Sequence, residues 1–559
     1  MKIWEILAKA DLSNSNTKII DQLLTNRGIT IQKDRNSFLS PPRATGLQAK
    51  DVSIDGSELG RATTRIKKAI EKGESIVVYS DYDADGITAG AVMWETIHKL
   101  GGNVMPYVPH RVEEGYGLSV KGIDAVQTEY HPGLIITVDH GITGHEKVAY
   151  AKSLGIDVIV TDHHVKPEIL PDCIIVHTTR LSGAGISWFV ACHLAAAFGK
   201  TSEVDMFDLL GLAAMGTIAD MVPLTGPNRS IAKYGLEALN ATTRVGIVAL
   251  LTEAGLMQGS LSTYDVSHIL APRLNAMGRL VHAKDALRLL CTNSSEKATE
   301  LAALLGTTNK ERQQLTIDTT LHAHGSLVSS LQGKALLKKL IFIHDKNYNQ
   351  GIIGLVAGKL VEEYYRPTIV VAQGEEISKA SARSISGFNI VEAIRSCSDI
   401  LIDVGGHPMA AGFTVETKHL TLLQQRLEDI AERELSVDML SRVLKIDIEL
   451  PLVSAQEALW QSLRSFEPFG FGNSEPIFCS RAVEVKEARL VGAEGKHLKL
   501  RLKVPASGII VDAIAFKMGE LYGKLQGNAA CDIAYTLDMN VWNGTSKLQL
   551  KVKDIHPLE

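Results

Sequence analysis

Four short runs rich in Ile and Val constrain the fold of this chain more than any other feature of its sequence. They occupy residues 75–81, 133–139, 157–162 and 173–178, and none alternates apolar with polar residues. Strands that are apolar on both faces are typical of a parallel sheet with helices packed on each side. The segments between them have helical periodicity, and the one at 145–155 closes on a glycine suited to a helix end. The sequence therefore predicts an α/β unit built on a buried parallel sheet.

Acidic side chains follow three of these predicted strands. The first run leads into carboxylates at alternate positions, the second ends at Asp139, and the third ends at Asp162 and continues with His163 and His164. A further acid, Asp220, lies in the largely apolar segment 216–224, where a buried carboxylate needs a partner. Ligands of open parallel sheets bind at the carboxyl ends of the strands. We therefore expect these side chains to converge on one crevice.

A divalent metal centre explains why like charges gather at one sheet edge. The candidate ligands are Asp83, Asp85, Asp139, His163 and Asp220. Carboxylates with an imidazole suit Mn²⁺, with Mg²⁺ as a weaker substitute. The set is large enough for two ions about 3.5–4 Å apart, bridged by Asp139, the spacing that supports phosphoester hydrolysis. Taken alone, the pattern DxDxDG also fits a calcium loop or an acidic turn, although no Glu stands at the EF-hand distance.

The rest of the chain is predicted to form three further parts. Residues 296–325 have helical periodicity and many charges, which favours a long connecting helix. Apolar runs at 339–345 and 366–373 flank a helical pattern and predict a second, smaller α/β unit. From about residue 440 strand-like segments dominate, which is typical of a small β-barrel of OB type.

Composition narrows the class of protein. A net charge of −5 argues against a globally basic nucleic-acid binder, while leaving a local basic channel open. The six cysteines contain no CxxC pair, which favours a reduced cytoplasmic protein over a disulfide framework or a zinc site. The N-terminus turns polar too early for a signal peptide, and no apolar run approaches the ~20 residues of a membrane span. We expect a cytoplasmic protein without membrane contact.

The acidic segments together resemble the motifs of the DHH phosphoesterase family. They read SDYDADGIT, VDHGI, TDHH and GTIADMVPL, and GGHPMAAGF at 405–413 resembles the signature of the DHHA1 domain that accompanies them. APRLNAMGRL (271–280) and FEPFGFGNSEPIF (466–478) are similar to stretches of the RecJ exonucleases, a branch of this family. The resemblance implies a parallel-sheet DHH domain and a smaller α/β DHHA1 domain joined by a long helix, followed by an OB-type barrel. The expected division is 1–50 as an N-terminal segment, 51–295 as the DHH domain, 296–325 as the connecting helix, 326–435 as the DHHA1 domain and 440–559 as the OB-fold domain.

The resemblance also implies roles for individual side chains. Asp83 and Asp139 resemble ligands of a first metal, and Asp85, Asp139, His163 and Asp220 resemble those of a second. A catalytic set is implied in which His164 contacts the scissile phosphate, Asp162 orients the imidazoles and Asp139 bridges the metals. The residues that resemble a cradle for the 5′-terminal phosphate are Ser381, Arg383 and His407. The residues that resemble the lining of the DNA path are Arg111, Tyr116, Arg273, Asn275 and Arg279.

A basic stripe is predicted on one strand of the barrel. Lys496, Lys499 and Arg501 are interspersed with apolar residues, and the nearby segment 466–471 holds three phenylalanines. A basic groove with aromatic side chains is the usual platform for single-stranded nucleic acid. The alternative is a solvated strand face beside core aromatics, which is the commoner state of such residues.

Three positions depart from the pattern of the relatives. Tyr79 stands where many relatives have a histidine four residues before the first metal aspartate, so the first metal is expected to bind weakly or together with substrate. His140 stands where Asn or Cys is more usual, and Asn349 where His is commoner. None of these changes removes a carboxylate of the predicted metal centre.

The function implied by the resemblance is a metal-dependent 5′→3′ exonuclease that degrades single-stranded DNA to 5′-mononucleotides in recombination and repair. The implied partners are single-stranded DNA, single-strand-binding protein and a RecQ-type helicase, and the enzyme is expected to be a monomer. One alternative is a DHH phosphoesterase for short oligonucleotides or cyclic dinucleotides, against which the long C-terminal barrel argues. The other is a replication scaffold without activity, against which the complete set of metal ligands argues.

Overall fold

The computed structural model describes residues 2–9, 15–330, 337–504, 508–527, 529–542 and 544–558. Its first large unit contains a five-stranded parallel sheet in the order β3-β2-β4-β5-β6. The strands are β2 Ile76–Ser80, β3 Val104–Tyr107, β4 Leu134–Val138, β5 Asp157–Asp162 and β6 Ile174–His177. Every residue of β2 and β4 is buried, which confirms the prediction of a parallel sheet covered on both faces.

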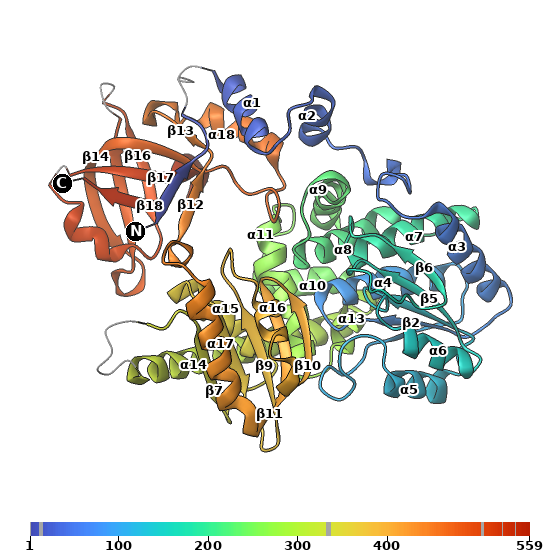
Figure 1. The fold of residues 1–559 in the computed structure, drawn as a ribbon. Helices are drawn as coiled ribbons and strands as arrows, with labels where there is room; N and C mark the ends of the chain where they lie inside the picture. The colour runs from blue at the N-terminus through green and yellow to red at the C-terminus, as the bar shows by residue number, and fades with distance from the viewer. Residues whose placement is uncertain are drawn as a thin grey trace.

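Helices cover this sheet and extend the unit to one side (Figure 1). They are α3 Gly56–Glu71, α4 Ala84–Lys99, α5 Val120–Tyr130, α6 His145–Ser153, α7 Gly183–Ala197, α8 Met206–Ala219, α9 Gly226–Ala241, α10 Val245–Ala254, α11 Thr263–Asp265, α12 Ala271–Leu280 and α13 Lys284–Cys291. Helix α4 begins at Ala84, directly behind the acidic turn, because the Asp83 side chain accepts hydrogen bonds from the backbone N–H groups of Asp85 and Gly86. The first turn of α4 therefore carries Asp85 into the crevice at the strand ends.

A single long helix, α14 Ser295–Ser330, leads from this unit to the second one, as predicted (Figure 1). The second unit holds a sheet in the order β10-β11-β9-β8-β7, in which only the β7–β8 pair is parallel. Its elements are β7 Ile341–Asp345, α15 Ile353–Tyr364, β8 Thr368–Ala372, β9 Ile377–Arg383, α16 Ile390–Arg395, β10 Leu401–His407, β11 Ala410–Glu416 and α17 Leu420–Glu434.

The C-terminal unit is a closed five-stranded barrel, since β14 pairs with both β15 and β17. Its elements are β12 Val443–Ile446, β13 Ile448–Glu449, α18 Glu457–Leu463, β14 Phe478–Val491, β15 His497–Lys503, β16 Ile510–Ala515, β17 Ala530–Trp542 and β18 Thr545–Pro557. At the start of the strand-rich stretch predicted from about residue 440, the short strands β12 and β13 lie outside the closed ring. Sequence analysis missed β14, the longest strand, because its charged residues obscure the alternation of its apolar ones.

The N-terminal segment begins on the barrel unit (Figure 1), and its end also contacts helix α9 of the parallel-sheet unit, where Tyr234 donates to the carbonyl of Pro41. It contains β1 Ile3–Ile6, α1 Asn16–Asn26 and α2 Gln32–Leu39. Strand β1 pairs in parallel with β12, and Leu23 and Phe38 belong to the core of the barrel unit. Among the described residues, we find no helix long and apolar enough to cross a membrane.

Arg229 joins the barrel unit to the parallel-sheet unit. Its guanidinium is 1% exposed and donates to the carbonyl oxygens of Phe38, Ser465, Phe466 and Glu467 at 2.7–3.0 Å. Four carbonyl groups from two chain segments therefore hold one buried cation, which fixes the barrel against helix α9.

Candidate functional site

The carboxyl ends of β2, β4 and β5 meet in one crevice, as the sequence predicts. From β2 and the start of α4 come Asp83 and Asp85, and the latter is 1% exposed. Asp85 accepts hydrogen bonds from the backbone N–H groups of Gly183 and Ala184 at 2.7 and 2.9 Å, where helix α7 begins. Burial raises the pKa of Asp85 to about 6, and the charge of Asp83 adds to this shift. The N-terminus of α7 thus stabilises the ionised form of Asp85, which burial alone would disfavour.

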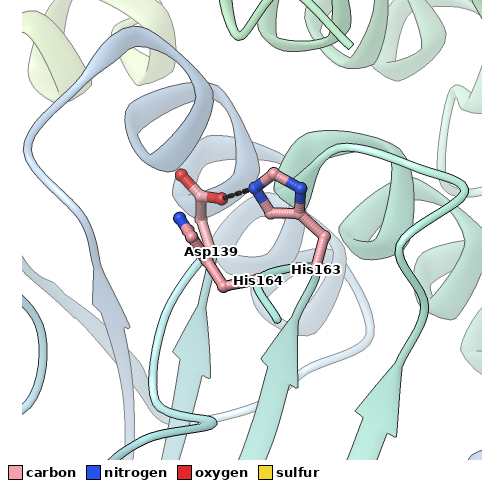
Figure 2. Close-up of side chains that lie close together, drawn as sticks. All are labelled: Asp139, His163 and His164. Atoms are coloured by element: carbon pink, nitrogen blue, oxygen red, sulfur yellow. Dashed lines mark ion pairs between the residues drawn. The ribbon is translucent and has the colours of Figure 1, made fainter. Parts of the chain in front are cut away.

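Asp139 lies at the centre of the crevice in an uncommon backbone conformation. Its φ is +70°, a left-handed value, and its side chain points to His163, whose Nε2 lies 3.1 Å from Asp139 Oδ1 (Figure 2). A Cβ atom on Gly183 would lie 2.4 Å from this carboxylate, so only glycine lets α7 approach so closely. Burial and repulsion by Asp85 hold the pKa of Asp139 well above its usual value.

His163 and His164 are oriented by the acid that precedes them. Asp162 accepts hydrogen bonds from the backbone N–H of Ile142 at 2.8 Å and from Nδ1 of His164 at 2.7 Å. Burial alone would lower the pKa of His164, but the bond to Asp162 raises it to about 9. Nε2 of His164 lies 3.1 Å from the hydroxyl of Tyr116, on the segment predicted to border the DNA entrance. The two imidazoles therefore face different groups, His163 the acids and His164 the mouth of the crevice.

Asp220 completes the predicted set from a different element, since it caps the C-terminus of α8. Its Oδ2 lies 3.6 Å from Nε2 of His163. Burial raises the pKa of Asp220 to about 8, with repulsion from Asp85 and Asp83 as the next causes. Asp83, Asp85, Asp139, His163 and Asp220 thus come together, as expected.

Sequence analysis left one member of this cluster without a role. Asp81 is 3% exposed, and its carboxylate lies with those of Asp83 and Asp139 in a group whose ligand atoms are all within 4.8 Å of one another. Its position directly after a buried strand is the signal that points to it. We call Asp81, Asp83, Asp85, Asp139 and Asp220 the acidic cluster.

The donor set fits a divalent metal. Two further groups with the same spacing are Asp85–His163–Asp220 and Asp139–His163–His164. Asp139 Oδ1 and His163 Nε2 are buried atoms without a hydrogen-bond partner, although they lie next to each other. Buried polar atoms that lack a partner are costly unless a ligand satisfies them. Oxygen ligands with one imidazole are the chemistry that Mn²⁺ and Mg²⁺ accept.

Arginines from several elements lie near the acidic cluster. The pKa of Arg279 is lowered to about 10, first by burial and then by the charges of Arg111, Arg312 and Arg383, while Asp83 opposes the shift. The guanidinium of Arg111 stacks 5.0 Å over the ring of Tyr82. In the described residues no carboxylate forms an ion pair with any of these four arginines. The hydrogen bonds of Arg279, Arg312 and Arg383 go to neutral oxygens. We call Arg111, Arg279, Arg312 and Arg383 the arginine cluster.

Two of the residues predicted to hold a 5′-phosphate lie at this cluster. Ser381 and Arg383 share strand β9, where Arg383 Nη1 donates to Ser381 Oγ at 3.2 Å. The third, His407, ends strand β10, which is separated from β9 in the same sheet by β11.

Two of the predicted DNA contacts have hydrogen-bond partners within the protein. Arg273 donates to Glu253 at 2.6 Å and to the carbonyl of Ile269 at 2.8 Å. Asn275 accepts a hydrogen bond of 2.7 Å from the backbone N–H of Ala84 and so supports the acidic turn. The structure thus gives both side chains roles in holding the fold of the site.

Lys499 and Arg501 of the basic stripe lie on β15, where the leucines are buried and the cations point away from the core, and Lys496 lies directly before the strand. Lys496 pairs with Glu494 at 2.6 Å, and Arg501 pairs with Glu487 at 3.4 Å, so acids partly offset the stripe. No ion pair of Lys499 is found in the part of the barrel that is described. Phe466 is a core residue at 0% exposure, whereas Phe471 is 56% exposed.

Tyr79 and His140, two of the residues that differ from the pattern of the relatives, lie together behind the crevice. Their rings are 5.3 Å apart, and Nε2 of His140 lies 3.0 Å from the carbonyl oxygen of Tyr79. Both are buried, and burial lowers the pKa of His140 to about 4. Neither belongs to the groups of residues with metal-ligand spacing.

Comparisons with known proteins agree with this arrangement. Models of three domain families match the chain: "DHH family, N-terminal domain" over residues 75–217, "DHHA1 domain" over 332–433 and "RecJ OB domain" over 446–554. The chain is 36% identical to the single-stranded-DNA-specific exonuclease RecJ of Bacillus subtilis, covering 96% of this chain and 68% of that protein. It is 33% identical to RecJ of Haemophilus influenzae, covering 98% and 97%.

A solved structure extends the likeness to three dimensions. The crystal structure of RecJ from Thermus thermophilus in complex with Mn²⁺ matches with a TM-score of 0.80 at 30% identity, covering all of this chain and 80% of that one. The DHH phosphoesterase architecture expected from the acidic motifs is therefore confirmed, and the chain belongs to the RecJ family of single-stranded-DNA-specific exonucleases.

Proposed function

We propose that this protein is a metal-dependent exonuclease that degrades single-stranded DNA from its 5′ end and releases 5′-mononucleotides. The observation that carries the proposal is the position of the acidic cluster beside the arginine cluster. One can hold metal cations, and the other can hold the phosphates of a strand. The domain bounds expected from the sequence, from the N-terminal segment 1–50 to the OB-fold domain 440–559, are part of this proposal.

The metal centre is proposed to use the residues named from the sequence. Asp83 and Asp139 would hold one ion, and Asp85, Asp139, His163 and Asp220 would hold a second, with Asp81 in reach of the first group. When bound, two Mn²⁺ or Mg²⁺ ions activate water and neutralise charge on the phosphate under attack. RecJ of Thermus thermophilus has been solved in complex with Mn²⁺ and with Mg²⁺, which supports this choice of metals.

The protein's own side chains then orient the scissile phosphate. Asp162 fixes Nδ1 of His164, which leaves Nε2 at the mouth of the crevice, where Tyr116 now contacts it. We assign His164 the contact to a non-bridging phosphate oxygen and Asp162 the role of holding that imidazole in place. Because Tyr116 is 53% exposed, it can move aside or stack on a base when a strand enters.

The direction of degradation is proposed to come from the second unit. Ser381, Arg383 and His407 would bind the 5′-terminal phosphate, and charge-assisted hydrogen bonds make such a cradle selective for a chain end. Arg111 and Arg279 would contact the phosphates between this cradle and the metal centre. The basic stripe Lys496, Lys499 and Arg501 is proposed to guide the rest of the strand along the barrel.

The cellular setting follows from the family and stands as a proposal. The enzyme would act in recombination and repair in the cytoplasm, as a monomer, on single strands exposed by a RecQ-type helicase and covered by single-strand-binding protein. A pull-down with purified single-strand-binding protein and with a RecQ-type helicase, compared with albumin, tests these two contacts directly.

A nuclease assay tests the main proposal. Single-stranded and duplex oligonucleotides labelled at the 3′ end, each with a 5′-phosphate, are incubated with Mn²⁺, Mg²⁺ or EDTA. We expect stepwise shortening of the single strand from its 5′ end with either metal, none in EDTA, and a duplex that stays intact. Intact single strands in Mn²⁺ would support the scaffold alternative. If a parallel digest of dinucleotides gave cleavage while the long strands stayed intact, the short-substrate phosphoesterase would be supported instead.

A further inference from the structure

A cavity of about 620 Å³ lies between helices α14 and α15, next to the proposed 5′-phosphate cradle. One face of α14 and one face of α15 line it, and Arg383 of strand β9 forms one end. Because Arg383 also belongs to the cradle, the cavity is continuous with the place proposed for the 5′-terminal phosphate. None of the metal ligands lines it. We call this cavity the α14–α15 groove.

The charges of the groove favour an anion. Arg312, Lys359 and Arg383 line it, against a single acid, Glu362. The guanidinium of Arg312 is held by Asn309 Oδ1 at 2.9 and 3.2 Å, and that of Arg383 by Ser381 Oγ and the carbonyl of Ala382. These partners are neutral, so the positive charges are positioned without being cancelled. A preorganised cation of this kind gains most from an anionic ligand.

The backbone of α15 leaves room for that ligand. Gly354 lies in its first turn, and a Cβ atom there would stand 2.9 Å from Ser381 Oγ and 3.1 Å from Arg383 Nη2. Gly358, one turn later, has nothing within 4 Å of where its Cβ would be. Any larger residue at Gly354 would crowd the two side chains that the cradle needs. The glycines keep the path from the cradle into the groove open.

We propose that the α14–α15 groove receives the β- and γ-phosphates of a strand with a 5′-triphosphate, so that the enzyme also degrades 5′-polyphosphorylated ends. This inference rests on the proposed role of Ser381 and Arg383 in holding the phosphate next to the first sugar. A 5′-monophosphorylated strand ends at that phosphate, whereas a 5′-triphosphorylated strand extends beyond it by the β- and γ-phosphates. The groove adjoins Arg383 and offers two further cations, Arg312 and Lys359.

The bond that breaks is the same for either kind of end. Water adds to the phosphorus between the first and second nucleotides, and the 3′ oxygen of the first nucleotide leaves and takes up a proton. With a 5′-triphosphate the first product is therefore a nucleoside triphosphate, and the shortened strand carries an ordinary 5′-monophosphate. Every later turnover releases a mononucleotide.

The test compares one sequence with a 5′-hydroxyl, a 5′-monophosphate and a 5′-triphosphate in single-turnover reactions. We expect the triphosphate end to react within about 3-fold of the monophosphate end and to release a deoxynucleoside triphosphate first. Lys359→Gln should slow the triphosphate end about 10-fold and leave the monophosphate end unchanged, since the lost contact is a charge-assisted hydrogen bond. The matched control is Lys418→Gln, which removes an exposed lysine. Lys418 follows the C-terminal end of strand β11, whereas the other end of β11 pairs with Arg383 of the cradle.

Several results would overturn the inference while leaving the proposed function intact. One is a triphosphate end that resists while the monophosphate end is degraded. Another is release of pyrophosphate before any nucleotide, and a third is an equal effect of Lys359→Gln on both ends. Failure of the proposed function itself has a different signature, since none of the three substrates would then be shortened.

Discussion

The acidic cluster and the arginine cluster differ in the sign of their charge but share one property. In neither cluster do nearby side chains of opposite charge balance the charges of its members. Asp85 and Asp139 are buried, Asp220 beside them is half-buried, and the pKa values of all three are raised. Arg279 and Arg383 lie close to other arginines, and burial together with these charges lowers their pKa values. Inside a stable core such groups are normally paired. We therefore propose that each cluster is completed by a ligand, a metal cation for the acids and a phosphate for the arginines.

Arg229 is the contrasting case within the same chain. It is as buried as any residue of either cluster, yet four carbonyl oxygens of the protein satisfy its guanidinium. No ligand is needed there, and the contact stabilises the junction of two units. The comparison separates buried charges that serve binding from buried charges that serve the fold, and the predictions below test that separation.

The largest effect is expected from Asp139→Asn. Loss of the carboxylate proposed to bridge the two ions should lower kcat/KM on single-stranded DNA by at least about 10³-fold, since both ions would lose a ligand. In EDTA the same variant should be more stable than the wild type by about 1–3 kcal/mol, because a buried and repelled charge is gone. Nuclease kinetics, Mn²⁺ titration calorimetry and thermal unfolding in EDTA measure the three quantities. Lower stability in EDTA would contradict our interpretation of the acidic cluster.

Arg229→Ala should act on stability instead. Removing the guanidinium leaves the carbonyls of Phe38, Ser465, Phe466 and Glu467 without their donor, which we expect to cost about 3 kcal/mol. Differential scanning calorimetry should show an earlier transition, while Mn²⁺ affinity below that transition stays within about 2-fold of the wild type. Arg229→Lys, which keeps the charge but loses the forked geometry, should recover only part of the loss. Weaker Mn²⁺ binding at unchanged stability would place Arg229 with the ligand-binding charges.

The sequence predicted the acidic cluster better than the arginine cluster, for a physical reason. Carboxylates at the ends of buried parallel strands must share one sheet edge, so Asp83, Asp139 and His163 follow from local patterns alone. Arg312 lies in a charged helix where nothing local separates it from solvated neighbours. Only the packing of α14 against α15 and β9 gives it a role, and that packing is a long-range property.

Long-range pairing also explains the errors in the fold. The N-terminal strand β1 pairs with β12, at the far end of the chain, and no local pattern announces this. In β14 the charged residues at alternate positions face outward on a barrel, so the strand lacks the apolar run that marked the parallel sheet. The assignments of Arg273 and Asn275 came from a resemblance, and the structure adds internal partners for both.

The acidic cluster also predicts how stability depends on pH. The pKa of Asp85 is raised to about 6 and that of Asp220 to about 8, above the unfolded value of about 3.9. A raised carboxyl pKa contributes stability at low pH that is lost as pH rises through the folded value. In EDTA we therefore expect the free energy of unfolding to fall by several kcal/mol between about pH 4 and pH 8, at ~1.4 kcal/mol for each pH unit over which a carboxyl group is protonated only in the folded protein.

Metal should reverse this trend, because Mn²⁺ binds the ionised carboxylates. Thermal unfolding at several pH values, with EDTA or with saturating Mn²⁺, separates the two curves. Asp220→Asn provides the matched variant, since it should flatten the EDTA curve above about pH 7. Parallel curves with and without Mn²⁺ would show that these carboxylates do not bind the ion.

The smallest effects are expected on the barrel, where the basic stripe is partly paired. Arg501 already contacts Glu487 at 3.4 Å and is half exposed, so Arg501→Gln should weaken binding of a long single strand less than about 2-fold. Lys499→Gln removes a cation for which the described residues offer no ion pair, and we expect about a 3-fold loss at low salt. Fluorescence anisotropy with a strand of about 30 nucleotides at two salt concentrations measures both. A larger effect of Arg501→Gln would show that an ion pair within the protein does not decide how much a surface cation contributes to DNA binding. The distinction between paired and unpaired charges would then hold only for buried groups.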